Sequence, residues 1–276
     1  MRKLILALMI LTAVILACKK EQNYQLDRPE SIIWNPVTQT YLISNVGSGT
    51  ILSLQDKFLF NIFNRSKLEA PKGMAILDNI LYVADVTRVV GLDLKTGKQT
   101  FEKAIPDAVF LNDVTADDDR SIYVSDSRSN FIVRVVPETG FTEFFRNPKL
   151  VSPNGLFYAK QADKDLLYIV SMEADTPILI LNLFSKELTE VPDHKLTRAD
   201  GITRDLEGNW LISSWADSTV YKFSPDFSEL SRLQNTYQSP ADIFYSIENK
   251  ELAIPHMQTN MITFVSEEKS TRVENK

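Results

Sequence analysis

The sequence predicts an all-β protein, a six-bladed β-propeller built from four-stranded antiparallel blades. One strand-like phrase returns six times, as YLISNV (41–46), LYVADV (81–86), IYVSDS (122–127), LYIVSM (167–172), WLISSW (210–215) and ELAIPH (251–256). One position upstream of each phrase stays in phase, with spacings of 42, 40, 42, 46 and 41 residues. After the N-terminal apolar stretch, no segment shows helical periodicity.

Each repeat supplies four strands. The repeated phrase is the second strand, rich in Ile, Val, Leu and Tyr. A shorter strand precedes it, as in GLFYAK (155–160), and two follow it, as in RVVGLDL (88–94) with KQTFEKAI (98–105). Turn residues at 95–98 and 138–140 separate such strands. Four strands in about 42 residues describe a propeller blade. A β-solenoid would need shorter coils, and a β-sandwich would not keep one position in phase six times.

The propeller is predicted to span residues 28–267, and residues 268–276 form a tail or a closing strand. The last repeat has only three clear strands. Its fourth must come from STRVEN (270–275) or, by strand exchange, from NYQL (23–26), and both remain open.

The N-terminal segment has the pattern of a bacterial lipoprotein signal. Basic residues 2–3 precede an uninterrupted apolar stretch that ends in Ile-Leu-Ala-Cys at 15–18, a lipobox-like sequence. Cys18 is the sole cysteine, so lipidation explains it better than a disulfide. We expect a signal peptide over 1–17, a lipidated linker over 18–27, and a lipid-anchored protein on the periplasmic or outer-surface side of a cell envelope. The alternative is a plain secretory signal.

The composition excludes nucleic acid as an expected partner. Charged residues make up 24% and hydrophobic residues 44% of the chain, as in globular proteins. The formal net charge is −6, and no basic stripe offsets it. The membrane is expected to be contacted through the N-terminal lipid alone.

The position kept in phase lies where the first strand of each repeat begins. It holds Glu30, Lys72, Asn112, Asn154, Asp200 and Ala241. In a propeller the first strand lines the central channel, so these residues should form one circle at the channel mouth, here called the mouth ring. Glycine follows the ring at Gly73, Gly155 and Gly201, which indicates crowded backbone there.

The mouth ring predicts a cation site. Glu30, Asn112, Asn154 and Asp200 offer hard oxygen donors of the kind Ca²⁺ takes. The ring holds neither cysteine nor histidine, so zinc is not expected. Two interpretations compete with calcium. Asn and Asp could simply be turn formers, and the Lys72 ammonium would repel a nearby cation. Lys72 must turn outward to Asp85 or replace the metal in a cluster with Glu30 and Asp200.

The ends of the second strands return to the same face and are expected to form an outer circle at the mouth. Its members are Asn45, Asp85, Asp126, Glu173, Trp215 and His256, give or take one position. His256 is the histidine placed to act as a base or a substrate contact, with simple packing as the alternative.

The motifs RPESIIWNP, LNDVTADDDRSIYVSD, SPNGLFY and ADGITRDLEGNWLISSW resemble the SMP-30/gluconolactonase family, which is related to the paraoxonases. The resemblance covers most of residues 28–267. It implies a divalent metal, usually calcium, and hydrolysis of a lactone or related ester. By matching motif, Glu30, Asn154 and Asp200 would be metal ligands, Asn112 a fourth ligand or substrate contact, and Asp200 the general base. Sugar lactonases often carry Arg where this chain has Phe110, which favours a more apolar substrate.

A second interpretation requires no catalysis. LYVADVTRVVGLD and IYVSDSRSNFIVRV also resemble NHL-type repeats, which often serve as binding platforms. A propeller that has lost its metal could bind a small ligand or a protein without turnover. The chemistry of the mouth ring distinguishes the two interpretations.

Overall fold

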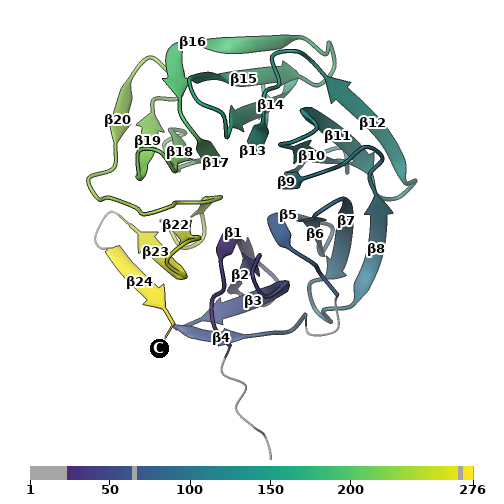
Figure 1. The fold of residues 1–276 in the computed structure, drawn as a ribbon, viewed down its shortest axis with the longest axis vertical. Helices are drawn as coiled ribbons and strands as arrows, with labels where there is room; N and C mark the ends of the chain where they lie inside the picture. Colours follow the sequence, from purple (N-terminus) through teal and green to yellow (C-terminus); the bar gives the residue numbers. More distant parts are fainter. Residues whose placement is uncertain (1–23, 64–66, 267–269, 276) are drawn as a thin grey trace, which may run out of the picture.

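The computed structural model describes residues 24–63, 67–266 and 270–275 and confirms the six-bladed β-propeller (Figure 1). Each blade is a four-stranded antiparallel sheet whose strands follow one another from the central channel outward. The described residues form no α-helix. No helix in these ranges is therefore long and apolar enough to cross a membrane. The predicted signal peptide and Cys18 lie outside the described residues.

The strands of blades 1 to 3 are β1 (Pro29–Asn35), β2 (Thr40–Asn45), β3 (Thr50–Gln55), β4 (Phe58–Phe60), β5 (Pro71–Leu77), β6 (Ile80–Asp85), β7 (Arg88–Asp93), β8 (Gln99–Ala104), β9 (Leu111–Ala116), β10 (Ile122–Asp126), β11 (Phe131–Val136) and β12 (Phe141–Arg146). Those of blades 4 to 6 are β13 (Pro153–Gln161), β14 (Lys164–Ser171), β15 (Thr176–Asn182), β16 (Leu188–Leu196), β17 (Ala199–Arg204), β18 (Trp210–Ser214), β19 (Thr219–Phe223), β20 (Leu230–Arg232), β21 (Phe244–Ser246), β22 (Glu251–His256), β23 (Met261–Val265) and β24 (Ser270–Glu274).

The core lies between blades rather than inside one layer. The second strands β2 and β10 are buried at every position, because both faces of these strands pack against other blades. The outer strand β8 instead alternates between exposed and half-buried residues. Six apolar clusters result, one at each interface between neighbouring blades.

The interface between blades 4 and 5 carries the largest aromatic cluster. The Trp210 side chain is fully buried there. Its ring stacks on Phe227 at 5.4 Å and meets the edge of Phe157 at 5.5 Å between centroids. Such pairs add stability beyond the area they bury, so this interface holds two blades rigidly around the channel.

The C-terminus closes the ring. Strand β24 pairs with β23 and completes blade 6, which settles the choice left open by the sequence. The Asn275 side chain then bonds both backbone groups of Leu26: Oδ1 accepts from its N–H at 2.6 Å and Nδ2 donates to its carbonyl at 2.8 Å. The start and the end of the described chain therefore meet at the junction of blades 1 and 6.

Candidate functional site

Strand register makes the six ring positions equivalent. In each blade the residue just before the ring position pairs with the last residue of the second strand. These pairs are Pro29–Asn45, Pro71–Asp85, Leu111–Asp126, Pro153–Ser171, Ala199–Ser214 and, as an isolated bridge, Pro240–His256. The structure thus places the six residues that the sequence aligned at one level of the channel.

The mouth ring is almost closed to solvent. Glu30 is 5% exposed, Asp200 3% and Asn154 1%, while Lys72 and Asn112 are each 4% exposed. Polar groups so deeply buried require partners, because a charge taken out of water is costly when nothing compensates it. The partners of each ring member therefore indicate what the ring can do.

Glu30 is the least compensated ring member. Its Oε2 is buried and accepts no hydrogen bond from any described residue. Burial, and next the negative charge of Asp200, raise the pKa of Glu30 well above its usual value. The Lys72 ammonium opposes this shift but does not cancel it.

Asp200 has a similar environment. Burial, followed by the charge of Asp242, raises the pKa of Asp200 to about 8. The Asn154 amide and the Trp215 indole oppose the rise. The buried Trp215 Nε1 lies near this carboxylate without reaching hydrogen-bonding geometry. The two carboxylates of the ring thus repel each other in a place that water barely reaches.

The two ring amides are held by neighbouring blades. Asn154 Nδ2 donates to the Ala199 carbonyl at 3.3 Å, across the boundary to blade 5. Asn112 Nδ2 donates to Ser127 Oγ at 3.0 Å. Both amide nitrogens are thus engaged, which leaves the amide oxygens as the groups that could ligate a cation.

Lys72 takes neither of the two expected positions. Its Nζ donates to the Ala70 carbonyl at 3.3 Å and lies 4.2 Å from the centroid of the Phe110 ring. Asp85 instead pairs with Arg88 at 2.9 Å. Burial lowers the pKa of Lys72, and the charge of Glu30 counteracts that effect. The Arg128 guanidinium lies 4.9 Å from the same Phe110 ring, so this aromatic gathers two cations at the mouth.

A second acidic level lies one residue deeper, and sequence reasoning missed it. Asp113 follows Asn112, and Asp242 follows the ring position of blade 6. Asp113 Oδ2 accepts from the Leu156 N–H of the next blade at 2.6 Å, and Asp242 Oδ2 accepts from Ser31 Oγ at 2.6 Å. Burial raises the pKa of Asp242 to about 7. Burial, followed by the charge of Asp242, also raises the pKa of Asp113.

Glycines make room for this second level. A Cβ on Gly73 would overlap Asp113 Cα and come within 2.8 Å of the Asn112 carbonyl oxygen. A Cβ on Gly201 would lie 2.7 Å from Asp242 Cα. The sequence did contain a sign of this second level. The position directly after the ring residue holds aspartate in some repeats and glycine in their neighbours.

The expected outer circle does not point into the channel. Asp85 Oδ1 accepts from the N–H groups of Glu69 and Ala70, both at 2.9 Å. Asp126 Oδ2 does the same for Val109 and Phe110, at 2.7 and 2.9 Å. In blade 1, Asn45 Oδ1 accepts from the Asp27 N–H at 2.9 Å. These side chains therefore fasten the loops that lead into the channel strands.

His256 performs the same fastening in blade 6. One ring nitrogen bonds the Gln238 carbonyl at 2.9 Å and the other bonds Thr263 Oγ1 at 2.8 Å. The side chain is 1% exposed, and burial lowers its pKa. With both nitrogens engaged, His256 is placed for packing rather than for proton transfer.

The last two members of the outer circle lie beyond the strand ends. The structure ends β14 at Ser171, two residues before Glu173, and β18 at Ser214, one residue before Trp215. Glu173 is exposed, and its carboxylate accepts from the Ala174 N–H in its own loop at 3.3 Å. Of the two, Trp215 alone approaches the mouth ring.

Two serines that the sequence did not single out tie neighbouring blades together. Ser125 Oγ accepts from the Asp113 N–H and donates to the Asn154 carbonyl, at 3.0 and 2.8 Å. Ser213 Oγ links Gly201 and Ala241 in the same way. The bonds of Ser125 and Ser213 hold ring residues of neighbouring blades at fixed spacing. Ser44 Oγ accepts from the Ser31 N–H at 2.9 Å within blade 1.

The channel widens away from the mouth ring. A cavity of about 380 Å³, here called the far cavity, is lined by residues of all six inner strands or the turns after them. Asp113 and Asp242 lie at its inner end, and apolar residues such as Ile33, Ile76 and Phe157 line it further along. It opens on the face where the inner strands end, opposite the mouth.

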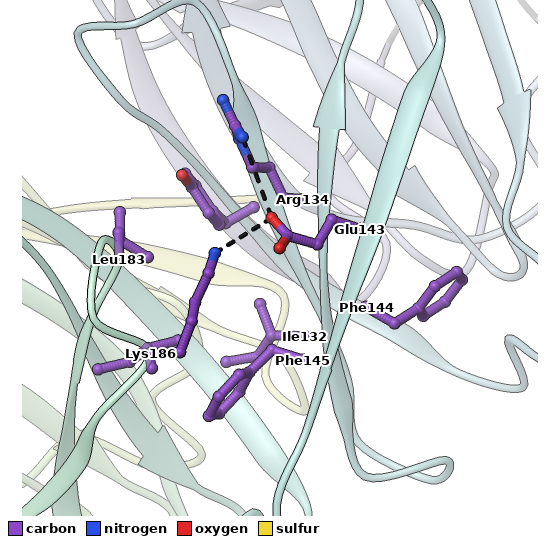
Figure 2. Close-up of a pocket in the computed structure, with 9 residues that line it drawn as sticks. Ile132, Arg134, Glu143, Phe144, Phe145, Leu183 and Lys186 are labelled. Atoms are coloured by element: carbon purple, nitrogen blue, oxygen red, sulfur yellow. Dashed lines mark hydrogen bonds and ion pairs between the residues drawn. The ribbon is translucent and has the colours of Figure 1, made fainter.

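A smaller pocket of about 90 Å³ lies on the outer flank between blades 3 and 4 (Figure 2). Glu143 bridges it, 3.1 Å from Lys186 Nζ and 4.0 Å from an Arg134 nitrogen. Because these charges satisfy each other at the surface, the pocket offers no reactive or unpartnered group.

A cation at the mouth ring would need mixed donors. Within the described ranges, no three His, Cys, Asp or Glu side chains lie close enough to hold a metal ion together. Glu30 and Asp200 would have to be joined by amide oxygens of Asn154 or Asn112 and by water. The uncompensated Glu30 oxygen fits such a set, and amide oxygens are donors of the kind that Ca²⁺ takes.

Comparisons with known proteins support the fold. No protein-family model matches the chain, and no curated protein matches it. Among solved structures it is similar to a chain of a nidogen/laminin complex, with 16% identity, a TM-score of 0.73, and coverage of 85% of this chain and 93% of that one.

Two lyases are also similar. Virginiamycin B lyase from Staphylococcus aureus shares 14% identity at a TM-score of 0.62, covering 92% of this chain and 85% of that one. A streptogramin B lyase shares 17% identity at 0.63, covering 81% and 74%. At these identities the similarities show the six-bladed propeller alone.

Proposed function

We propose that the mouth ring binds one Ca²⁺ ion and that the protein is a calcium-dependent hydrolase of a lactone or related ester. The buried Glu30 carboxylate carries this proposal, because its Oε2 has no partner among the described residues and Asp200 adds like charge nearby. A divalent cation would compensate both charges at once. The resemblance of the ring motifs to the SMP-30/gluconolactonase family points the same way.

Each ring residue has a role in this proposal. Glu30, Asn154 and Asp200 would hold the ion, and Asn112 would complete the set or contact the substrate. When bound, Ca²⁺ supplies a Lewis acid for the substrate carbonyl. Asp200 takes a proton from the attacking water and returns it to the leaving oxygen as the ester bond breaks. The Lys72 ammonium, fixed above Phe110, adds positive charge where the carbonyl oxygen becomes negative.

One observation favours a second function, ligand binding without turnover. The oxygen-donor residues of the ring are 1 to 5% exposed, so a substrate could reach them only if side chains at the mouth moved. The similar solved structures include two lyases and a chain of a protein complex. This fold therefore serves both chemistry and binding.

Calcium titration of the purified protein by calorimetry tests the proposal. We expect one saturable site per chain, lost in Asp200→Asn and kept in Asp163→Asn, a matched change at an exposed turn. An unaltered, folded protein that binds no Ca²⁺ would refute the metal site and with it the hydrolase.

A lactone and ester screen then separates the two functions. If the calcium-loaded protein hydrolyses a substrate and Asp200→Asn does not, the hydrolase stands. Calcium binding without hydrolysis of any lactone or ester would favour the binding platform. Whichever function holds, the predicted lipid anchor at Cys18 would keep the protein at a membrane surface. Mass spectrometry of the mature N-terminus tests the anchor.

A further inference from the structure

The far cavity has the size of a small-molecule site. Its volume of about 380 Å³ falls within the usual range for ligand pockets, roughly 300–1,000 Å³. It lies on the channel axis, and every blade contributes to its wall. None of the residues that line it belongs to the mouth ring, so it constitutes a separate site.

Two buried carboxyl groups form the inner end of the cavity. Asp113 and Asp242 stand on blades 3 and 6, which oppose each other across the channel (Figure 1). Gly73 and Gly201 leave the space that the two aspartates occupy. Hydrogen bonds from the Leu156 N–H and from Ser31 Oγ then fix the two carboxylates. Each carboxyl group is therefore held at one oxygen by a residue of the neighbouring blade.

These two carboxyl groups are not paired with a cation of the described chain. Neither aspartate forms an ion pair with a lysine, arginine or histidine in the described part of the chain. The buried Glu30 carboxylate lies beside both, and its Oε2 accepts no hydrogen bond from a described residue. Arg204, the basic residue of the cavity wall, is directed elsewhere, because its guanidinium bonds the Gly208 carbonyl and stacks on Trp210.

The wall further out is partly apolar. Ile33, Ile76 and Phe157 line it, together with Ile247, which is 63% exposed at the rim. Polar side chains lie among them, including Thr115, Thr203 and Glu248. A hydrated inorganic ion would gain nothing from the apolar part of this surface. A ligand with an apolar body would bury this apolar surface, which contributes roughly 25 cal/mol of binding free energy per Å². The cavity therefore suits a ligand that has a positive charge at one end and apolar surface along its length.

We propose that the far cavity binds a small organic amine, with its ammonium group between Asp113 and Asp242 and its apolar body against the channel wall. The ammonium donates to the free lone pairs of the two carboxylates and neutralises their repulsion. The apolar body fills the wide part of the channel. The ligand enters from the face opposite the mouth, so it does not compete for the mouth ring.

Three probes of one chain length test this proposal: n-hexylamine, 1-hexanol and hexanoate. Each is titrated into the purified protein by calorimetry in the presence of a calcium chelator, so that the result does not depend on calcium in the mouth ring. We expect saturable 1:1 binding of hexylamine, about tenfold weaker binding of hexanol, and weaker binding still of hexanoate. Equal binding of amine and alcohol, or no binding of amine, would overturn the proposal.

Two variants locate the bound amine. Asp242→Asn should weaken hexylamine about tenfold and leave hexanol unchanged. Ala116→Trp fills the cavity from its wall and should abolish binding of both. Leu230→Trp adds the same side chain on exposed β20 and should bind as the unaltered protein does. Undiminished amine binding by folded Ala116→Trp would refute the location, even if Asp242→Asn failed to fold.

Discussion

The two ends of the central channel are formed by the same six strands, yet they differ in nearly every physical property. At the mouth five of the six ring side chains are polar, all are buried, and two carboxylates face two amides and one ammonium. Two to five residues further along the same strands, the side chains are mostly apolar and enclose a cavity. A propeller can therefore separate two sites along one axis, because each inner strand carries both.

The glycines at the second level offer the largest test of this contrast. Gly201→Ala places a methyl group 2.7 Å from Asp242 Cα, so blades 5 and 6 must separate. We expect a loss of about 3 kcal/mol in the free energy of unfolding, measured by denaturant titration. Gly140→Ala, at a turn with φ of 69° and no close neighbour, should cost about 1 kcal/mol. Equal losses would mean that the channel does not depend on these close approaches.

Two buried carboxylates should respond in opposite directions to the same isosteric change. Asp85→Asn weakens an ion pair and two backbone hydrogen bonds, so it should destabilise the protein by about 2 kcal/mol. Asp242→Asn removes a charge that repels its neighbours, so at pH 8.5 it should stabilise the metal-free protein by about 1 kcal/mol. Chemical denaturation measures both. A loss of stability in Asp242→Asn at pH 8.5 would contradict uncompensated charge at this level.

Metal-free protein should lose stability as the pH rises. The folded-state pKa values of Asp200 and Asp242, about 8 and about 7, exceed the unfolded value near 3.9. The folded state therefore binds more protons, and stability falls between about pH 4 and pH 8. We expect the melting temperature to be several degrees lower at pH 8.5 than at pH 5.5. Calcium should restore it at pH 8.5, and a flat profile without calcium would refute the charge clustering.

The smallest expected effect concerns Lys72. Lys72→Met keeps much of the side-chain volume and removes the ammonium from the mouth ring. If the ring binds calcium, the calcium affinity of the variant should rise roughly tenfold. The Lys57→Met change, on an exposed turn, should leave the affinity unaltered. A lower affinity in Lys72→Met would mean that the lysine helps to organise the site instead of opposing it.

The fold and the position of the mouth ring could be predicted because both repeat. Six similar second strands and one position in phase are visible without any structure, and strand register reproduces that alignment up to Ala241. The second acidic level was missed because Asp113 and Asp242 occupy a position where three other blades carry glycine. Nothing local in the sequence shows that the glycine of one blade makes space for the aspartate of the next.

The direction in which side chains point was harder to predict than their position along the channel axis. Asp85, Asp126 and His256 were expected to form an outer circle at the mouth, since their strands end there. Their polar atoms instead satisfy backbone groups of the incoming loops or neighbouring side chains. Backbone groups left unpaired by a loop are specified by three-dimensional packing and not by residue type. For the same reason the sequence could not indicate that Lys72 lies over Phe110.

The junction at Leu26 and Asn275 also has a mechanical meaning. The chain enters the propeller beside the strand that ends it, and one asparagine side chain joins the two. Tension applied through the N-terminus would therefore act first on two hydrogen bonds at the seam between blades 6 and 1, and only afterwards on a sheet. A pull on the predicted lipid anchor would break this contact first, while the apolar interface of blades 1 and 6 still keeps the ring closed.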